Sequence, residues 1–321
     1  MYQQLRTQSG RAGRAVKLYS GLLAILLLAC CGSLPAQQAQ DEALYWRISQ
    51  GEREAGFLLG TIHSEDPRVL DFSESFMEQL ASCQVFAMEM VPDLPTLKRL
   101  ADFMHYATAG ELEDILGPER YRRAMEALSS YQVPAEWKEK MKVWAVMMTL
   151  SVPPPQTGFF MDLSLSLRAA GAGLQVSGLE TLEQQLSFLE DMPLDYQITL
   201  LDQALADYQQ IGEVHQQMIN SYLSGKLSAI SQLSAEQFDR LEPEIRDYFV
   251  SLGINRRNQR MLETLLPLLQ ESRVFVAIGA LHLPGEEGLL ALLRSRGFSL
   301  APLPLPISPV AEAKSPGDTD R

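Results

Sequence analysis

The sequence contains little cysteine and little histidine. It has 3 cysteines and 4 histidines among 321 residues. Cys30 and Cys31 lie near the N-terminus, so Cys83 is the single cysteine in the rest of the chain. One cysteine cannot form an internal disulfide, and it excludes a metal site built from cysteine ligands. We therefore expect Cys83 to be a small core residue.

Positive charge is also scarce. The chain carries 27 Lys and Arg against 40 Asp and Glu, for a formal net charge of −13. Four of the basic residues lie within the first twenty positions, where there is no acid, so the remainder is more acidic still. A strongly acidic chain repels phosphates, which argues against nucleic acid and against anionic lipid surfaces as partners.

Long apolar runs are absent except for GLLAILLLA at 21–29, which follows the basic segment. This order is typical of a secretory signal, and the run is too short for an ordinary membrane span. We assign residues 1–30 to the signal. LLAC resembles a bacterial lipobox, so we expect an exported, periplasmic protein that contacts a membrane only through a lipid anchor at Cys30. Cleavage near SLPAQQAQ and an uncleaved anchor are the alternatives.

Short apolar runs bounded by turn residues predict strands. They lie at 45–49, 56–63, 83–90, 174–180, 273–282 and 298–304. Strand and helix patterns alternate at both ends of the chain, and the middle is helical. This order predicts an α/β fold with a central mixed β-sheet flanked by helices and a helical insertion. The domain spans 43–304, and the proline-rich, charged tail 305–321 is expected to be disordered.

Two of the predicted strands end in the same pattern, Gly60-x-x-His63 and Gly279-x-x-His282. Functional groups of α/β sheets collect where the strands end, and glycine there permits a sharp turn and a close approach of the backbone to a ligand. Parallel neighbouring strands would let both imidazoles reach one ion. His215 also follows a glycine by three positions, but it lies in a helical pattern. We expect His215 and His105 to be exposed or to pack in helices.

Carboxylates end two further strands, Glu89 after VFAM and Glu180 after QVSGL. Two imidazoles and one carboxylate form a common catalytic metal set. His63, His282 and Glu89 are the candidate ligands, and Glu180 is a candidate general base or orienting group. The alternatives are a structural role for each histidine, a surface position for Glu89, and a helix first-turn role for Glu180.

Arg257 and Asn258 lie in the helical stretch that leads to the second histidine. They are either part of a solvated helix face or functional groups. In the second case, Arg257 clamps a substrate carboxylate or pairs with Glu180. The residue pattern leaves these two alternatives open.

Five segments together resemble the TraB/GumN family, which includes the Tiki metalloproteases. They are FLLGTIHSEDP, VFAMEM, GLQVSGLETLEQQLSFL, RRNQRM and VFVAIGALHLPGEEGLLALLRSRGF. The resemblance implies an erythromycin esterase-like or ChaN-like fold and metal-dependent peptidase activity with manganese, cobalt or zinc. It implies His63, His282 and Glu89 as the paired-histidine and glutamate motif, and it places Glu180, Arg257 and Asn258 in family blocks.

The sequence thus predicts an exported metal-dependent hydrolase, a peptidase that uses a metal-activated water. Its partner is a peptide or small-molecule substrate. Two alternatives stay open. One is a non-catalytic metal- or ligand-binding envelope protein that assists polysaccharide or pheromone handling. The other is an esterase on the same scaffold.

Overall fold

The computed structural model describes residues 41–307. The expected signal segment, Cys30, and residues 308–321 of the expected tail lie outside the described residues. Residues 305–307 lie inside them. Ile307 forms an isolated bridge with Phe72, and Ser73 N–H donates to the Pro306 carbonyl.

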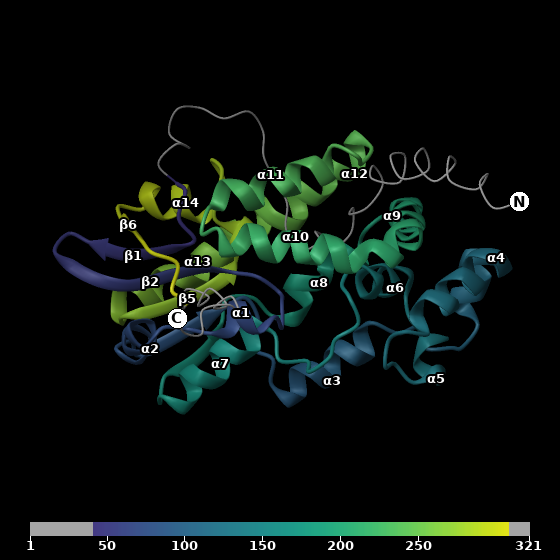
Figure 1. The fold of residues 1–321 in the computed structure, drawn as a ribbon, viewed down its shortest axis with the longest axis horizontal. Helices are drawn as coiled ribbons and strands as arrows, with labels where there is room; N and C mark the ends of the chain where they lie inside the picture. The colour runs from purple at the N-terminus through teal and green to yellow at the C-terminus, as the bar shows by residue number, and fades with distance from the viewer. Residues whose placement is uncertain (1–40, 308–321) are drawn as a thin grey trace, which may run out of the picture.

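The centre of the fold is a six-stranded mixed sheet in the order β4-β3-β5-β2-β1-β6 (Figure 1). The strands are β1 (Tyr45–Gln50), β2 (Arg53–Thr61), β3 (Val85–Met88), β4 (Gln175–Gly178), β5 (Val274–Gly279) and β6 (Ser299–Leu303). β4, β3, β5 and β2 are parallel, whereas β1 is antiparallel to both β2 and β6. The predicted α/β fold with a mixed sheet is confirmed.

Helices fill the connections between the strands. In the first half they are α1 (Pro67–Leu70), α2 (Glu74–Ala81), α3 (Leu94–Phe103), α4 (Glu111–Leu128), α5 (Ala135–Lys138), α6 (Val143–Leu150) and α7 (Met161–Gly171). In the second half they are α8 (Leu182–Glu190), α9 (Leu194–Asp207), η4 (Tyr208–Gln210), α10 (Ile211–Leu223), α11 (Leu227–Phe238), α12 (Pro243–Tyr248), the π-helix η5 (Phe249–Asn255), α13 (Arg256–Glu271), η6 (Ala280–His282) and α14 (Leu289–Ser295).

The helices that separate β3, β4 and β5 in the chain form the bulk of the molecule beside the sheet. Figure 1 shows the sheet at one end and α4, α5 and α6 extending toward the other. No helix among residues 41–307 has the length and apolarity needed to cross a bilayer.

A row of aromatic side chains fixes one face of the sheet. The strand register places Phe86, Phe275 and Phe57 side by side on β3, β5 and β2. Phe76 of α2 meets Phe275 edge-on, with ring centroids 5.3 Å apart. These rings are at most 1% exposed. Aromatic pairs of this kind add about 0.5–1.5 kcal/mol each beyond the area that they bury. The row holds together the strands whose ends carry the candidate site.

Local signals in the sequence set the helix that follows Glu180. Thr181 caps α8, and its side chain accepts from Gln184 N–H while the Gln184 side chain accepts from Thr181 N–H. This capping box satisfies two backbone donors that the first turn would otherwise leave unpaired. It therefore fixes the turn between β4 and α8.

Candidate functional site

The four parallel strands bring the predicted residues to one edge of the sheet. Glu180 follows β4, Glu89 follows β3, His282 follows β5 and His63 follows β2. Because these strands are neighbours in that order, their carboxyl ends meet at the same edge. The register of β2 and β5 shows that the two Gly-x-x-His strands are parallel neighbours, the condition under which both imidazoles could reach one ion.

The two glycines of the Gly-x-x-His motifs allow neighbouring strand ends to pack closely, and they are not needed for a left-handed turn. Neither has a positive φ, which corrects the reason that the sequence suggested. A Cβ on Gly60 would lie 2.8 Å from Leu283 Cδ1 and 3.1 Å from Ala280 Cα, in the turn after β5. A Cβ on Gly279 would lie 3.1 Å from Glu89 Oε1. Glycine at these positions thus lets one strand end pack against the next.

Glu89 is held by three donors. Gly279 N–H donates to Oε1 at 2.8 Å, while Arg257 Nη2 and Gln185 Nε2 donate to Oε2 at 2.7 and 3.1 Å. Burial alone would raise the pKa of this carboxyl, but the positive charge of Arg257 and the other donors outweigh burial and lower the pKa to about 2. Glu89 is therefore an ionised, fixed carboxylate whose side chain is 18% exposed.

Arg257 is the centre of a buried charge cluster. It donates from Nε and Nη2 to Glu180 Oε2 at 2.9 and 2.6 Å, and from Nη2 to Glu89. Its side chain is 5% exposed, so the solvated-face alternative is wrong and pairing with Glu180 is observed. Burial raises the pKa of Glu180, whose Oε1 has no hydrogen-bond partner. Two carboxylates thus share one guanidinium, and a net negative charge remains.

Asn258 fixes the orientation of His282. Its Nδ2 donates to the Glu287 carbonyl at 2.8 Å, so its Oδ1 faces His282 Nδ1, 2.6 Å away. An amide oxygen only accepts, so Nδ1 carries the proton and the lone pair of Nε2 accepts from Arg257 Nη1. Burial lowers the pKa of His282 to about 4, which keeps the ring neutral. Nε2 lies 3.9 Å from Glu89 Oε1 and 3.4 Å from Arg257 Nη1.

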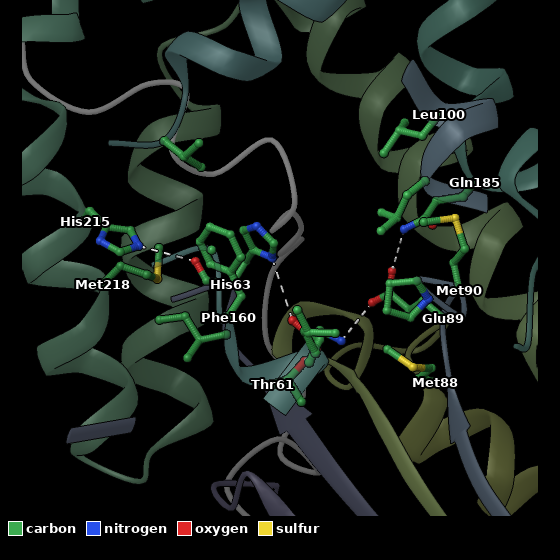
Figure 2. A pocket seen from close by; sticks show the side chains of 18 residues that line it. Thr61, His63, Met88, Glu89, Met90, Leu100, Phe160, Gln185, His215 and Met218 are labelled. Atoms are coloured by element: carbon green, nitrogen blue, oxygen red, sulfur yellow. Dashed lines mark hydrogen bonds and ion pairs between the residues drawn. The ribbon is translucent and has the colours of Figure 1, made fainter. Parts of the chain in front are cut away.

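His63 belongs to a second polar group on another wall. Its ring stacks on Phe160 with centroids 3.9 Å apart, and its Nδ1 lies 3.7 Å from Asp162 Oδ2. His215 Nε2 donates to the His63 carbonyl at 3.3 Å. No hydrogen bond or ion pair joins His63 to Glu89 or His282 among residues 41–307. Figure 2 shows His63, Phe160 and His215 together, apart from Glu89 and Gln185.

A cavity of about 500 Å³ lies between these two groups (Figure 2). Its polar lining residues are Thr61, His63, Glu89, Asp162, Gln185 and His215. Its apolar lining residues are Ile62, Met88, Met90, Pro92, Leu97, Leu100, Val152, Phe160, Leu163 and Met218. Cavities of this size and character are typical of sites for small molecules or peptide side chains.

The sequence pattern missed three cavity residues. His215 lies in α10, as predicted, but its ring lines the cavity instead of only packing in the helix. Phe160 and Asp162 come from the segment that begins α7, which carries no strand-end signal. Asp162 has one available signal, an acid in the first turn of a helix, but that signal is common on helices without any function.

The donor chemistry fits a divalent metal in part. No three His, Cys, Asp or Glu side chains in the described part of the chain lie together as a metal site. Glu89 and His282 supply two suitable donor types, with Nε2 and Oε1 3.9 Å apart. The net negative charge around Arg257 also favours a cation. His63 is the expected third donor, and it lies on the other wall.

Comparisons with known proteins show the family of the chain. A sequence model described as the TraB/PrgY/gumN family matches residues 44–302. The chain is 25% identical to metalloprotease TIKI1 of Danio rerio, over 88% of this chain and 68% of that protein. It is 24% identical to metalloprotease TIKI2 of Xenopus tropicalis, over 85% and 62% of the two chains. It is also 24% identical to metalloprotease TIKI1 of Homo sapiens, over 84% and 64%.

The chain thus spans about two thirds of the length of these relatives. No solved structure matches it significantly, so the fold-family names that the sequence resemblance implied stay predictions. The family match, in contrast, covers the sheet except its last residue, Leu303, and every residue of both polar groups. The chain belongs to the TraB/PrgY/gumN family.

Proposed function

We propose that this chain is a hydrolase that uses a divalent metal, manganese, cobalt or zinc, to cleave amide bonds of peptides in the cavity. The observation that carries the proposal is the pair of Glu89 and His282, an ionised carboxylate beside an imidazole whose Nε2 lone pair is fixed. The similarity to relatives that are named metalloproteases supports the choice of reaction.

Three residues would hold the metal. Glu89 would bind from one wall of the cavity and His63 from the other, and His282, which is buried and does not line the cavity, would bind next to Glu89. The His63 side chain is 42% exposed, and its ring stacks on Phe160. The chemistry that a divalent ion supplies to hydrolases is polarisation of the scissile carbonyl and activation of water.

The residues around this set would keep it in its working form. Arg257 holds the Glu89 carboxylate ionised and fixed, and Asn258 holds His282 in the tautomer that leaves Nε2 unprotonated. The Glu180 side chain is fully buried and reaches the set only through Arg257. An orienting role for Glu180 is therefore favoured over direct proton transfer to substrate.

The cavity walls favour peptides with apolar side chains. Leu97 and Leu100 of α3 and Leu163 of α7 line the cavity and present no hydrogen-bonding side chains. Sugars need many polar partners, which such walls do not supply, and acidic substrates would meet Glu89 and Asp162. A neutral peptide segment therefore suits this cavity better than a polysaccharide.

We also propose that the protein works outside the cytoplasm, in the periplasm, anchored through Cys30 or released. The support is the sequence of residues 1–30 alone. Mass spectrometry of the N-terminus from the native host tests this. A lipidated Cys30 or cleavage near residue 38 is expected, and an intact N-terminus in the cytoplasmic fraction would contradict export.

The function is tested on the purified full chain in two steps. Elemental analysis after loading with manganese, cobalt or zinc measures bound metal. A library of neutral apolar peptides, followed by mass spectrometry, then measures cleavage. His282→Ala and Glu89→Gln remove the two placed donors. His105→Ala is the matched control, because this histidine lies outside the cavity and contacts the Ala101 carbonyl.

We expect about one metal ion per chain, loss of that ion in both donor variants, and cleavage only in the loaded wild type and control. Equal metal binding by all variants would refute the site. Metal binding without cleavage of any peptide would instead support a ligand-binding envelope protein.

A further inference from the structure

We propose that Asp162 is the positioning residue of His63. Its carboxylate holds the ring with the proton on Nδ1, so that Nε2 keeps the lone pair needed to bind a metal. This proposal rests on the proposed function for the use of that lone pair. The orientation itself is a property of the metal-free chain and is tested without metal.

Asp162 is placed so that one oxygen is occupied and the other faces the ring. Thr61 Oγ1 donates to Asp162 Oδ1 at 2.7 Å, which ties the end of β2 to the first turn of α7. Oδ2 then lies 3.7 Å from His63 Nδ1. This separation exceeds a hydrogen bond, and such contacts in unliganded sites are often long and tighten in the complex.

Two further contacts restrict His63. Phe160 lies nearly parallel to the ring, at an interplanar angle of 14°, and so limits the plane in which the imidazole can lie. His215 Nε2–H donates to the His63 carbonyl and holds its backbone. With the plane and the backbone held, the remaining choice is which ring nitrogen carries the proton. A carboxylate oxygen near Nδ1 makes that choice, because it only accepts.

The start of α7 is itself anchored to the segment around His63. Met161 N–H donates to the Ser64 carbonyl at 3.0 Å. The Glu65 carboxylate accepts from Thr157 N–H and Gly158 N–H at 2.8 and 2.9 Å, just before Phe160. The segment that carries Phe160 and Asp162 is therefore held against the residues next to His63 by contacts independent of Asp162 itself.

The same arrangement exists at the other histidine. Asn258 places an oxygen at Nδ1 of His282, and Asp162 places one near Nδ1 of His63. The two residues come from different helices, α13 and α7, and share no sequence pattern. Metal-binding histidines commonly donate their second ring N–H to an oxygen, which fixes tautomer and direction. Both Gly-x-x-His histidines thus have an oxygen on the Nδ1 side, and in His282 the unprotonated Nε2 accepts from Arg257 Nη1 at 3.4 Å.

The competing explanation is that Asp162 serves only the helix, since an acid in the first turn stabilises the N-terminus of α7. Asp195 is a matched control for that role. It occupies the second position of α9, as Asp162 occupies the second position of α7, and it lies outside the cavity. Asp195→Ala removes a first-turn acid alone.

The test is long-range ¹H–¹⁵N NMR of the full chain labelled at histidine, without metal. At about pH 8 an ordinary histidine is neutral, so the spectrum shows which ring nitrogen of each histidine carries the proton. His63→Gln assigns the His63 signal. We expect the Nδ1–H form for His63 in the wild type and in Asp195→Ala, and a majority of the Nε2–H form in Asp162→Ala. Asp162→Asn keeps the size of the side chain and is therefore the variant less prone to misfold. In it we expect a smaller fraction of the His63 Nδ1–H form than in the wild type.

A second readout is the affinity for Mn²⁺ or Co²⁺ alone. A lost orienting partner typically weakens metal binding 10- to 100-fold, and this is expected for Asp162→Ala but not for Asp195→Ala. An unchanged His63 tautomer in both Asp162 variants overturns the positioning role. A tautomer change in a chain that binds no metal supports the positioning role and refutes the proposed function instead.

Discussion

Replacing Arg257 with methionine tests whether the buried charge cluster is held by this one side chain. The substitution removes the single cation that separates two buried carboxylates. Glu180 would lose both of its donors and would have no partner, because its Oε1 already has none. Glu89 would keep Gly279 N–H and Gln185 Nε2. Most of the destabilisation should therefore come from Glu180.

The expected loss at pH 7.5 is large. Breaking a buried ion pair by removing one partner typically costs about 3–5 kcal/mol, because an uncompensated charge remains in the interior. This is a sizeable part of the roughly 5–15 kcal/mol that stabilises an ordinary protein. Arg256→Met is the matched control, since Arg256 is the exposed neighbour on α13. Its effect should stay within about 0.5 kcal/mol.

The pH dependence gives the reasoning a second check. In the wild type the pKa of Glu89 is lowered to about 2, so its stabilising contribution is complete above about pH 4.5 and is lost as the pH falls toward 2. In Arg257→Met burial dominates and raises the pKa of both carboxyls. They then bind protons as the pH falls below neutral, which stabilises the variant. The difference in the free energy of unfolding between the wild type and Arg257→Met should therefore become smaller from pH 7.5 to pH 5.

Urea unfolding at both pH values measures the free energy of unfolding. A deficit below about 1 kcal/mol at pH 7.5 would refute the view that Arg257 neutralises the cluster. A deficit that grows toward pH 5 would refute the protonation argument. Adding Glu180→Gln to Arg257→Met should recover part of the loss, because the two residues interact directly.

Three further changes test the surroundings of the site. Gly279→Ala should leave folding intact but weaken metal binding about tenfold, because its Cβ would lie 3.1 Å from Glu89 Oε1. An unchanged affinity when the variant is titrated with metal would contradict the importance of this contact. Glu65→Gln should lower the free energy of unfolding by about 1–2 kcal/mol at pH 7, because three backbone N–H groups and the Thr157 hydroxyl lower the pKa of Glu65 to about 2. Urea unfolding should show this difference vanish from pH 4.5 to pH 2, and a constant difference would exclude the carboxylate as its cause. Leu97→Ser should weaken the binding of apolar peptides about tenfold in calorimetry, and equal binding would show that α3 is not part of the site.

The centre of the sheet could be predicted from the sequence because the middle strands β2, β3 and β5 are buried on both faces. The β5 segment VFVAIG and the β2 segment GFLLGT are continuous apolar runs next to turn residues, as parallel strands commonly are. The repeated Gly-x-x-His pattern lies on β2 and β5, which are parallel neighbours. The helix boundaries were less accessible. The π-helix before Arg256 has no distinct pattern, and α4 continues across a kink at Gly117, where φ is 71°.

The site could be predicted only where a strand carried it to the sheet edge. Glu89, Glu180 and His282 follow directly from strand ends. Arg257 needed the structure, because a helix pattern with two adjacent arginines does not show which one points inward. Asp162 lies far from His63 in the sequence, and only the packing of α7 against the end of β2 brings them together.

The two walls of the cavity differ in a way that bears on the metal. Around Arg257 every group is fixed by short contacts, and the ring of His282 is buried and held by Asn258. Around His63 the contacts are longer and the ring is partly exposed. A site whose donors were all rigid would need them all at the right distance before the ion arrives. Here the fixed wall supplies the negative charge that attracts a cation, and the looser wall supplies the donor that can adjust. The absence of a preformed three-residue group in residues 41–307 is therefore compatible with a site that forms only when metal binding moves the His63 ring toward Glu89 and His282.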